Sequence, residues 1–296
     1  QLTDNGLLGV LSCSSKNPNL VAENSEIWNI GFTWEGIENL SISMDYQEIE
    51  YVDRIITLSA QDVANQQFYN ALAATGSTAA TYDNTPGSAS RTAALAWVAA
   101  NPDSTITRNA SGVIEEVVRV ADNINSNLVD VFDITATYSF NYQDWGAFNL
   151  AFNAAYYVTY DYAGLDGNLI DARGRRNADT ALSPPLPELV STLRLGWVRD
   201  NHAATFLTKY TDEFTFDGSH TTAIITPRAV IPESYQANAS YTYFFDDLFN
   251  SSGSVTLAVQ NVFDWEPRRL PVTGGFESRL YDNFGRMFSL AVDFEL

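Results

Sequence analysis

Two groups of arginines are the first candidates for chemistry in this acidic chain. The chain has 16 Lys and Arg against 36 Asp and Glu, a formal net charge of −20. One group is Arg173, Arg175 and Arg176; the other is Arg268 and Arg269, which follow Trp265. Guanidinium groups hold phosphates and carboxylates through paired, charge-assisted hydrogen bonds. Both groups are therefore candidates for an anionic ligand, and the alternative is that they are ordinary solvated loop cations.

Three aromatic side chains lie in segments without strand character. They are Tyr82, Trp97 and Trp265. Their rings have an apolar face and a polar edge, so they could stack on a sugar ring. The competing interpretation is that they pack within their own loops.

Oxygen-bearing side chains gather at Asp161, Asp166, Asn168 and Asp171. Such groups suit calcium, but their spacing does not match an EF-hand loop, and an ordinary Asp-Gly turn is the simpler interpretation. Cys13 is the only cysteine, which excludes an internal disulfide and a cysteine-based zinc site. We predict no metal and no cofactor.

Catalysis is not expected. His202 lies in a predicted turn, and His220 has only Asp217 and Ser219 nearby in sequence, which is not triad geometry. No phosphate-binding glycine loop, HExxH or CxxC is present. The acidic balance also argues against a nucleic-acid partner, which needs a basic patch.

The elements that carry these side chains are strands. In the last stretch, Phe288, Leu290, Val292, Phe294 and Leu296 alternate with polar or small residues, and this period of two is typical of a strand with one apolar face. Eight more such strands are predicted, beginning near the following residues: 28, 40, 114, 148, 189, 203, 235 and 255. Residues 1–23 read as a loop, and 203–216 as one continuous strand.

Long and short connections alternate strictly between these strands. The longest, 58–112, is rich in Ala, Asn, Ser and Thr, and we predict two helices in it, near 60–74 and 89–100. The other long loops are 163–186, 217–232 and 264–280. Short turns at one end and long loops at the other are the pattern of outer-membrane barrels, whose long loops are extracellular.

The two faces and two aromatic belts agree with this pattern. The opposite face of each predicted strand consists mainly of Ser, Thr, Asn, Gln and Gly, which is typical of a water-filled barrel lumen. Aromatic residues cluster near both strand ends, as in the interfacial girdles of membrane barrels. The turn-side set is Trp34, Trp145, Trp197, Tyr243 and Phe249, and the loop-side set is Tyr160, Tyr162, Phe214, Phe216, Trp265 and Tyr281.

Three motifs resemble TonB-dependent receptors. NPNLVAENSEIWNIGFTWE (17–35) resembles their entry into a barrel strand, VTLAVQNVFDWEPRR (255–269) their penultimate strand, and YDNFGRMFSLAVDFEL (281–296) their closing segment. The resemblance spans essentially the whole chain. It departs at the end, because the family usually finishes on an aromatic residue, whereas this chain ends on Leu296.

The resemblance implies that residues 1–296 are about the last nine strands of a 22-stranded antiparallel transmembrane β-barrel. Nothing here resembles the family's plug domain or its TonB box. It also implies an outer membrane of a Gram-negative bacterium, contact with lipid and lipopolysaccharide, and coupling to TonB through a plug outside this sequence. The ligand would be a siderophore, cobalamin or an oligosaccharide. The alternatives are a passive porin-like or plugless barrel, and a surface receptor or adhesin without transport.

Two expectations follow about the ends of the chain. QLTDNGLLGV is not a signal peptide, so we expect an upstream segment to have preceded it. Nine strands make too small and odd a ring for a bacterial barrel. We therefore predict an open, curved sheet whose last strand pairs with 253–263 and not with Ile27–Trp34, completed by an N-terminal part of the protein, a surface lipoprotein or another second chain.

Overall fold

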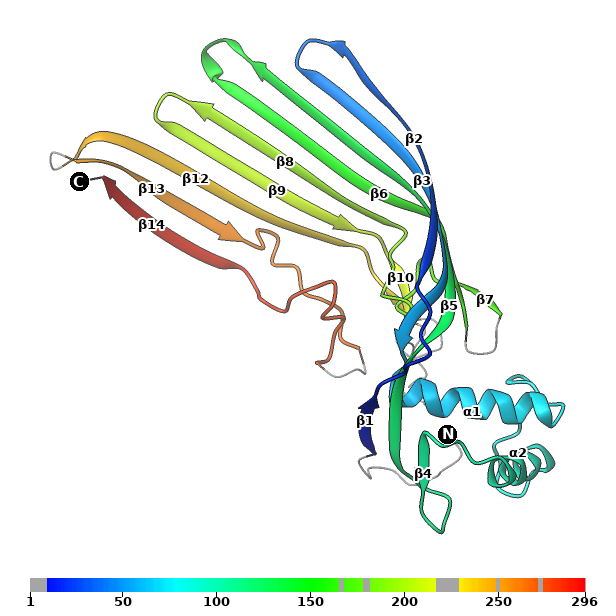
Figure 1. The fold of residues 1–296 in the computed structure, drawn as a ribbon. Coiled ribbons are helices and arrows are strands. Elements are labelled where there is room, and N and C mark those ends of the chain that lie inside the picture. Colours follow the sequence, from blue (N-terminus) through cyan, green and yellow to red (C-terminus); the bar gives the residue numbers. More distant parts are fainter. Residues whose placement is uncertain are drawn as a thin grey trace.

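Nine long strands form one curved antiparallel sheet. The computed structural model describes residues 10–164, 168–177, 182–216, 229–248, 251–270 and 274–295. The strand order is β14-β13-β12-β9-β8-β6-β5-β3-β2, so each long strand pairs with its neighbours in sequence (Figure 1). The strands are β2 (Asn24–Ile37), β3 (Leu40–Thr57), β5 (Ile114–Asn141), β6 (Ala147–Ala163), β8 (Leu189–Arg199), β9 (His202–Thr211), β12 (Ser234–Leu248), β13 (Ser251–Gln260) and β14 (Met287–Glu295). The nine predicted strands and their order are confirmed.

One end of the sheet carries only tight connections. The β2–β3, β5–β6 and β8–β9 turns lie at this end, and the helices and small strands lie at the other. Asn39 and Asp200 adopt positive φ angles of 60° and 47° in two of these turns. Asn and Asp tolerate this conformation, which favours short hairpin connections. We call the two ends of the sheet the turn end and the loop end.

The strand register sorts side chains onto two faces. Directly opposed residues share a face: Phe32 pairs with Met44, which pairs with Ile134, and Leu257 pairs with Leu290. We call this the apolar face. On the other side, which we call the polar face, Thr135 lies between Ser43 and Asn153. The apolar face is also exposed, since Trp28 is 66% and Leu290 68% accessible.

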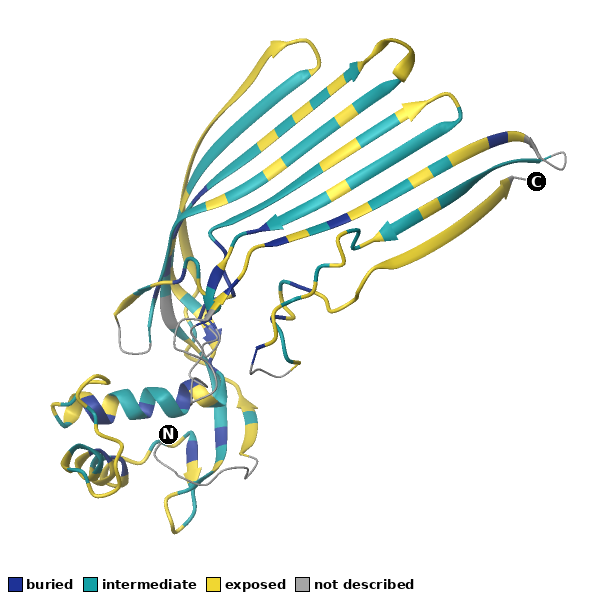
Figure 2. Cartoon of the chain, turned by 180° about the vertical axis from the view of Figure 1, so that it is seen from behind, coloured by how far each residue is buried: buried dark blue, intermediate teal, exposed yellow. Residues whose placement is uncertain are grey.

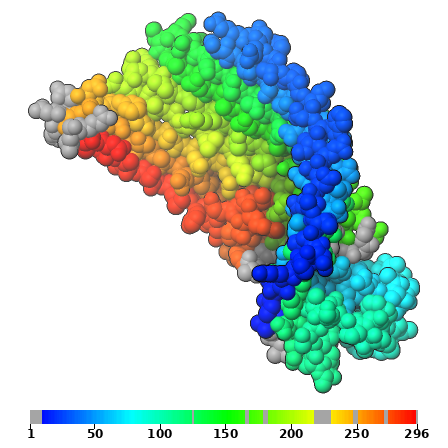
Figure 3. All heavy atoms as spheres, in the orientation of Figure 1, coloured from blue at the N-terminus to red at the C-terminus, as the bar shows by residue number. Residues whose placement is uncertain are grey.

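Both edges of the sheet are open in the described chain. β14 pairs with β13, from Gln260–Met287 to Ser252–Glu295, and β2 pairs with β3. No described strand covers the outer side of either, and both are exposed along their length (Figure 2). The two edge strands lie at opposite margins of the curved wall (Figure 3). The predicted open sheet is confirmed.

The longest loop folds into the predicted helices. They are α1 (Ala60–Ala74) and α2 (Ala89–Ala100). The Ser59 side chain accepts from the Asp62 N–H while the Asp62 carboxylate accepts from the Ser59 N–H, a capping box that starts α1. The loop also contains a short strand that was not predicted, β4 (Ile106–Arg108), which pairs with β5. Neither helix has the length and apolar character that a bilayer-spanning helix needs.

The prediction of a loop over residues 1–23 was partly wrong. Leu11–Ser15 form β1, which runs parallel to β5 with Leu11 opposite Glu116 and Ser15 opposite Val120. β5 has 28 residues and extends beyond the sheet, so its backbone groups there need another strand. A single polar-looking segment gives no periodic signal for such a local pairing. Residues 1–9 lie outside the described chain.

The prediction of a single strand over 203–216 was also wrong. β9 ends at Thr211, and Phe214–Phe216 form a separate strand, β10, which pairs with β11 (Ala229–Ile231). The Asp212 carboxylate accepts hydrogen bonds from the Tyr210 hydroxyl and the Glu213 N–H, which turns the chain between the two strands. The alternation of side chains continues across this break, so the pattern alone did not reveal it.

The loop-side aromatic belt has different members from those predicted. Tyr162, Phe214, Phe216 and Tyr281 are at most 5% exposed and pack inside loop cores, joined by the partly buried Tyr160 and Trp265. The apolar face at this height carries another set, which the register aligns across five strands: Tyr46, Phe132, Tyr156, Tyr210 and Tyr235. The turn-side members Trp34, Trp197 and Tyr243 do lie on the apolar face. Phe249 is outside the described residues.

Candidate ligand-binding loops

The first loop core joins the long loop to the β6–β8 loop. Leu58 and Val63 from the start of α1 pack with Val117 of β5 and with Leu182 and Leu186. Tyr157, Tyr160 and Tyr162 complete the contact, and their pairing with Val131, Val129 and Asn127 places them on the polar face. The β6–β8 loop, which contains the short strand β7 (Leu169–Asp171), therefore folds over the polar face at the loop end.

A second core ties the β9–β12 loop to the β13–β14 loop. Phe214 and Phe216 of β10, Ile231 of β11, Leu270 and Tyr281 are all buried in it. Arg175 forms isolated bridges to Thr215 and to Leu186, so the β6–β8 loop lies against β10. Loops from three neighbouring hairpins thus form one packed layer above the sheet, which we call the loop module (169–177, 182–188, 212–216, 229–233, 264–270 and 274–286).

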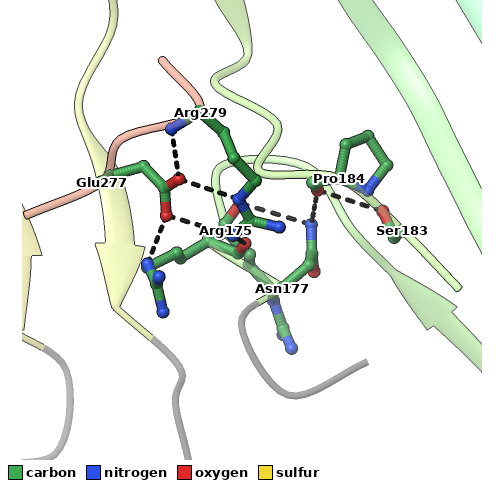
Figure 4. Close-up of polar contacts among 7 residues, drawn as sticks. Arg175, Asn177, Ser183, Pro184, Glu277 and Arg279 are labelled. Carbon is green, nitrogen blue, oxygen red and sulfur yellow. Dashed lines mark hydrogen bonds and ion pairs between the residues drawn. The ribbon is translucent and has the colours of Figure 1, made fainter. Parts of the chain in front are cut away.

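A buried carboxylate is the electrostatic centre of the loop module. Glu277 is 1% exposed and pairs with Arg176 from the β6–β8 loop. The same carboxylate accepts from Arg279 Nε at 2.8 Å and Nη2 at 3.1 Å (Figure 4). Burial opposes ionisation of Glu277, but the hydrogen bonds from Arg279 and the charges of Arg176 and Arg279 outweigh it and lower its pKa. Arg176 also lies over the Phe216 ring, 5.4 Å from its centroid.

Asn177 fixes the turn that presents this arginine. Its buried side-chain amide donates to the Pro184 carbonyl at 2.7 Å and to the Ala172 carbonyl at 3.1 Å. The residue adopts a φ of 49°, a conformation that Asn tolerates better than most residues. The β6–β8 loop is thereby closed on itself before it reaches Glu277.

Arg173 is held by an internal partner. Its guanidinium donates to both oxygens of Asp171, at 3.1 Å and 3.0 Å, and to the Val158 carbonyl. The hydrogen bonds from Arg173 lower the pKa of Asp171. Asp171 is therefore the partner of an arginine and is not left for a cation. Of the other proposed calcium ligands, Asp161 pairs with Asp171 in the β6–β7 register, and Asp166 lies outside the described residues.

The remaining predicted arginines differ in how free they are. Arg268 Nη1 donates to the Val230 carbonyl at 2.5 Å, which binds its loop to β11. Arg175 and Arg269 are exposed, and no side-chain hydrogen bond or ion pair joins either of them to the described part of the chain. Arg175 and Arg269 are therefore the two predicted arginines available to an anionic ligand.

The predicted aromatic residues lie in two separate places. Trp97 and Tyr82 pack against Ala71, Ala94 and Val98 between the two helices. Burial raises the pKa of the Tyr82 hydroxyl, and its ring meets Phe68 edge-on with centroids 4.9 Å apart. Trp265 instead packs on Tyr281 in the loop module, 4.9 Å between centroids. These rings contribute to packing, and the structure does not bring all three together.

Sequence reasoning missed Glu277, Arg279 and Tyr281 as organising residues. Burial, opposed by Ser234 and reinforced by Glu277, raises the pKa of Tyr281 to about 12. Residues in a loop have no periodic pattern that would show which side chains are buried. Glu277 can therefore be recognised as an organising residue only from its proximity to Arg176 and Arg279 in the folded structure. Across the described residues, no three His, Cys, Asp or Glu side chains are arranged to hold a metal ion. His220, Asp217 and Ser219 lie outside the described chain.

The arrangement has counterparts among solved structures. It is similar to the ferric enterobactin receptor PfeA (G324V mutant) of Pseudomonas aeruginosa, with TM-score 0.53 and 13% identity over 93% of this chain and 31% of that one. It is also similar to the outer membrane transporter YddB of Escherichia coli, with TM-score 0.54 and 10% identity over 97% of this chain and 34% of that one. A third counterpart is the siderophore receptor PirA of Acinetobacter baumannii, with TM-score 0.52 and 14% identity over 95% of this chain and 33% of that one. No protein-family model matches the chain, and no curated protein matches its sequence.

The fold is a long antiparallel sheet that matches about a third of the barrels of these outer-membrane proteins. The chain spans about a third of the length of each of these structures. The proteins it resembles are receptors and transporters, and none of their descriptions names an enzyme.

Proposed function

We propose that this chain is the C-terminal part of the barrel of an active outer-membrane transporter that takes up a scarce ligand, with energy coupled through TonB. One observation supports this most. The nine-stranded sheet has its apolar and polar faces in register from β2 to β14, with an aromatic belt at each end of the apolar face. An exposed apolar face of this size is stable in lipid and would aggregate in water.

The ligand class that we favour is a siderophore. The structural counterparts include a ferric enterobactin receptor and a siderophore receptor. In this chain, Arg175 and Arg269 are exposed cations on the loop module, and they suit an anionic chelate. Cobalamin and oligosaccharides are the other candidates, and for an oligosaccharide the stacking rings Tyr82, Trp97 and Trp265 would matter more.

In this proposal the loop module is the entrance and the polar face lines the lumen. The lipid contacts are phospholipid and lipopolysaccharide on the apolar face of an outer membrane. A plug domain encoded outside this sequence would contact TonB and carry the energy of the inner membrane to the ligand. No catalytic step is required.

The test is uptake by cells that make the full-length protein. We expect ferric-siderophore uptake to depend on the protein and to stop when TonB is deleted. Uptake that continues without TonB and rises linearly with concentration would favour the passive porin-like reading. Ligand binding without any uptake would favour a surface receptor.

A further inference from the structure

The apolar face carries an unusual pair of cationic and imidazole groups at its turn end. Arg199, the last residue of β8, lies directly opposite His202, the first residue of β9. Trp197 lies two residues before Arg199 on the same face. Directly opposed side chains in an antiparallel pair have Cβ atoms about 5 Å apart, so both groups can reach one small ligand.

Aromatic rings hold the imidazole in place. His202 stacks on Trp197 with centroids 6.4 Å apart and lies 5.2 Å from the Tyr243 ring. Its Nδ1 shares a short hydrogen bond with the Tyr241 hydroxyl. When Tyr241 donates this bond, the neutral ring keeps its proton on Nε2. No hydrogen bond joins Nε2 to a described residue, so in this tautomer its N–H is open to a ligand.

The guanidinium is only weakly engaged. Arg199 Nε lies 3.5 Å from a carboxylate oxygen of Asp200, and both side chains are well exposed, at 46% and 79%. Exposed pairs of this kind contribute little and exchange readily. Between the two aromatic belts, the apolar face carries no other Lys or Arg among the described residues. Arg199 is therefore a singular positive charge on a face that is otherwise apolar or acidic.

The depth of the pair selects its ligand. Trp197 and Tyr243 belong to the turn-side aromatic belt, and Tyr241 lies level with Trp197 across Ala204. Such belts lie at the level of the lipid headgroups. A group that meets Arg199 and His202 from the lipid side is therefore a headgroup. An arginine and an N–H donor match the unesterified oxygens of a phosphodiester.

We propose that Arg199 and His202 Nε2–H form a recognition site for the phosphate of a phospholipid headgroup in the leaflet at the turn end. This inference rests on the proposed membrane function. Arg199 supplies charge and paired donors, His202 supplies an N–H donor, and Trp197 and Tyr243 hold the imidazole ring in place. No covalent step is involved.

The test uses the full-length protein in bilayers of phosphatidylethanolamine and phosphatidylglycerol, with histidine labelled in its ring nitrogens. Solid-state NMR measures dephasing of ring nitrogens by lipid phosphorus, and the His202 signal is assigned by its loss in His202→Gln. We expect dephasing of Nε2 and not of Nδ1, and at least a twofold reduction in Arg199→Gln. Arg194→Gln on the polar face is the matched control and should change nothing.

Each other outcome decides against the site. Equal dephasing by inorganic phosphate in lipid-free micelles would mean a general anion site and would overturn the assignment to lipid. Absence of dephasing in protein whose strands are protected from protease would overturn the inference and leave the proposed function intact. Failure of the protein to insert at all would overturn the proposed function, and this inference with it.

Discussion

Arg176 and Glu277 form a buried ion pair that joins the β6–β8 loop to the β13–β14 loop across the two intervening strands β9 and β12. Arg279, which lies in the same loop as Glu277, forms a second ion pair with that carboxylate. Loops that connect separate hairpins would otherwise move independently. The pair, together with the core around Phe214 and Leu270, makes the loop module a single cooperative unit.

Glu277→Gln should loosen the loop module more than any other single loop substitution. It leaves Arg176, which is 11% exposed, without its carboxylate. Breaking a buried pair costs about 3–5 kcal/mol, and we expect the lower end because Arg279 is half exposed. Hydrogen exchange should accelerate in β10 and β11 and remain unchanged in β8. Arg269→Ala is the control, and equal effects of both variants would contradict the role of Glu277.

The loop module should also open in acid. The folded-state pKa of Glu277 is lowered from 4.5, so its contribution is fully present above about pH 4.5 and is lost as the pH falls through the lowered value. Protease cleavage within 264–286 should therefore increase below pH 4.5. Glu277→Gln should remove this pH dependence, and a wild-type profile in the variant would assign the opening to another group.

The sheet could be predicted from the sequence because apolar residues recur at every second position of its strands and so mark one face. Phe288, Leu290 and Val292 show this alternation. β1 could not be foreseen, since it depends on how far β5 extends beyond the sheet. The prediction that Phe214 and Phe216 continue the strand of the large sheet was wrong for a related reason. Their side chains do alternate as in a strand, but that strand is β10, which pairs with β11 in the loops and not with the sheet.

The lipid and lumen faces can be separated by cysteine labelling. The positions expected to face lipid are Trp28, Phe32, Phe148, Leu150, Leu193, Tyr241, Leu257 and Leu290, and the register places all of them on the apolar face. Those expected to face the lumen are Ser43, Asn149, Arg194, Asn238, Gln260 and Asp293. A lipid-soluble probe should label the first set and a water-soluble probe the second. Equal water access at both sets would rule out a membrane barrel.

The long loop should be accessible from outside the cell. Residues 58–112 contain α1 and α2 at the loop end of the sheet, and long barrel loops are extracellular. Protease added to intact cells should cut between the helices, around 76–88. Cleavage that requires permeabilised cells would reverse the proposed orientation.

Ligand binding should depend on the arginines that have no internal partner. Arg175→Ala and Arg269→Ala should each weaken binding of an anionic ligand by about 1.5–3 kcal/mol, the value of a charged hydrogen bond. Arg173→Ala should act mainly on the loop, because Arg173 already binds Asp171 and the Val158 carbonyl. Calorimetry distinguishes the two effects. Unchanged affinity in both exposed-arginine variants would remove them from the binding site.

The sequence identified these arginines as a group but could not rank them. Arg173, Arg175 and Arg176 look equivalent in the chain. Their partners come from Asp171 close by and from Glu277 far along the sequence, and only the second requires the folded loops. Sequence spacing is therefore enough to find the arginine cluster. Only the folded structure shows that Arg175, unlike Arg173 and Arg176, has no internal carboxylate partner within the described part of the chain.

Two glycines of the sheet, Gly253 on the apolar face and Gly196 on the polar face, should respond very differently to alanine. At Gly253, opposite Phe294, an added Cβ would lie 2.0 Å from the Asp293 carbonyl oxygen, a backbone atom that cannot turn away. At Gly196 the nearest atoms lie at 3.7 Å, in Asn149, which is ordinary contact. Gly253→Ala should therefore force β14 away from β13 and cost about 1–3 kcal/mol, the usual range for overpacking.

The measurement is the midpoint of thermal unfolding of the barrel in bilayers, with Gly196→Ala as the matched control. Gly196→Ala should be neutral or slightly stabilising, because alanine restricts the unfolded chain more than glycine does. Loss of pairing should also increase hydrogen exchange of β14 near Phe294 before that near Phe288, since the clash lies at the C-terminal end of the strand. Equal midpoints for the two variants would mean that β14 tolerates displacement, and that its pairing with β13 contributes little to the stability of the sheet.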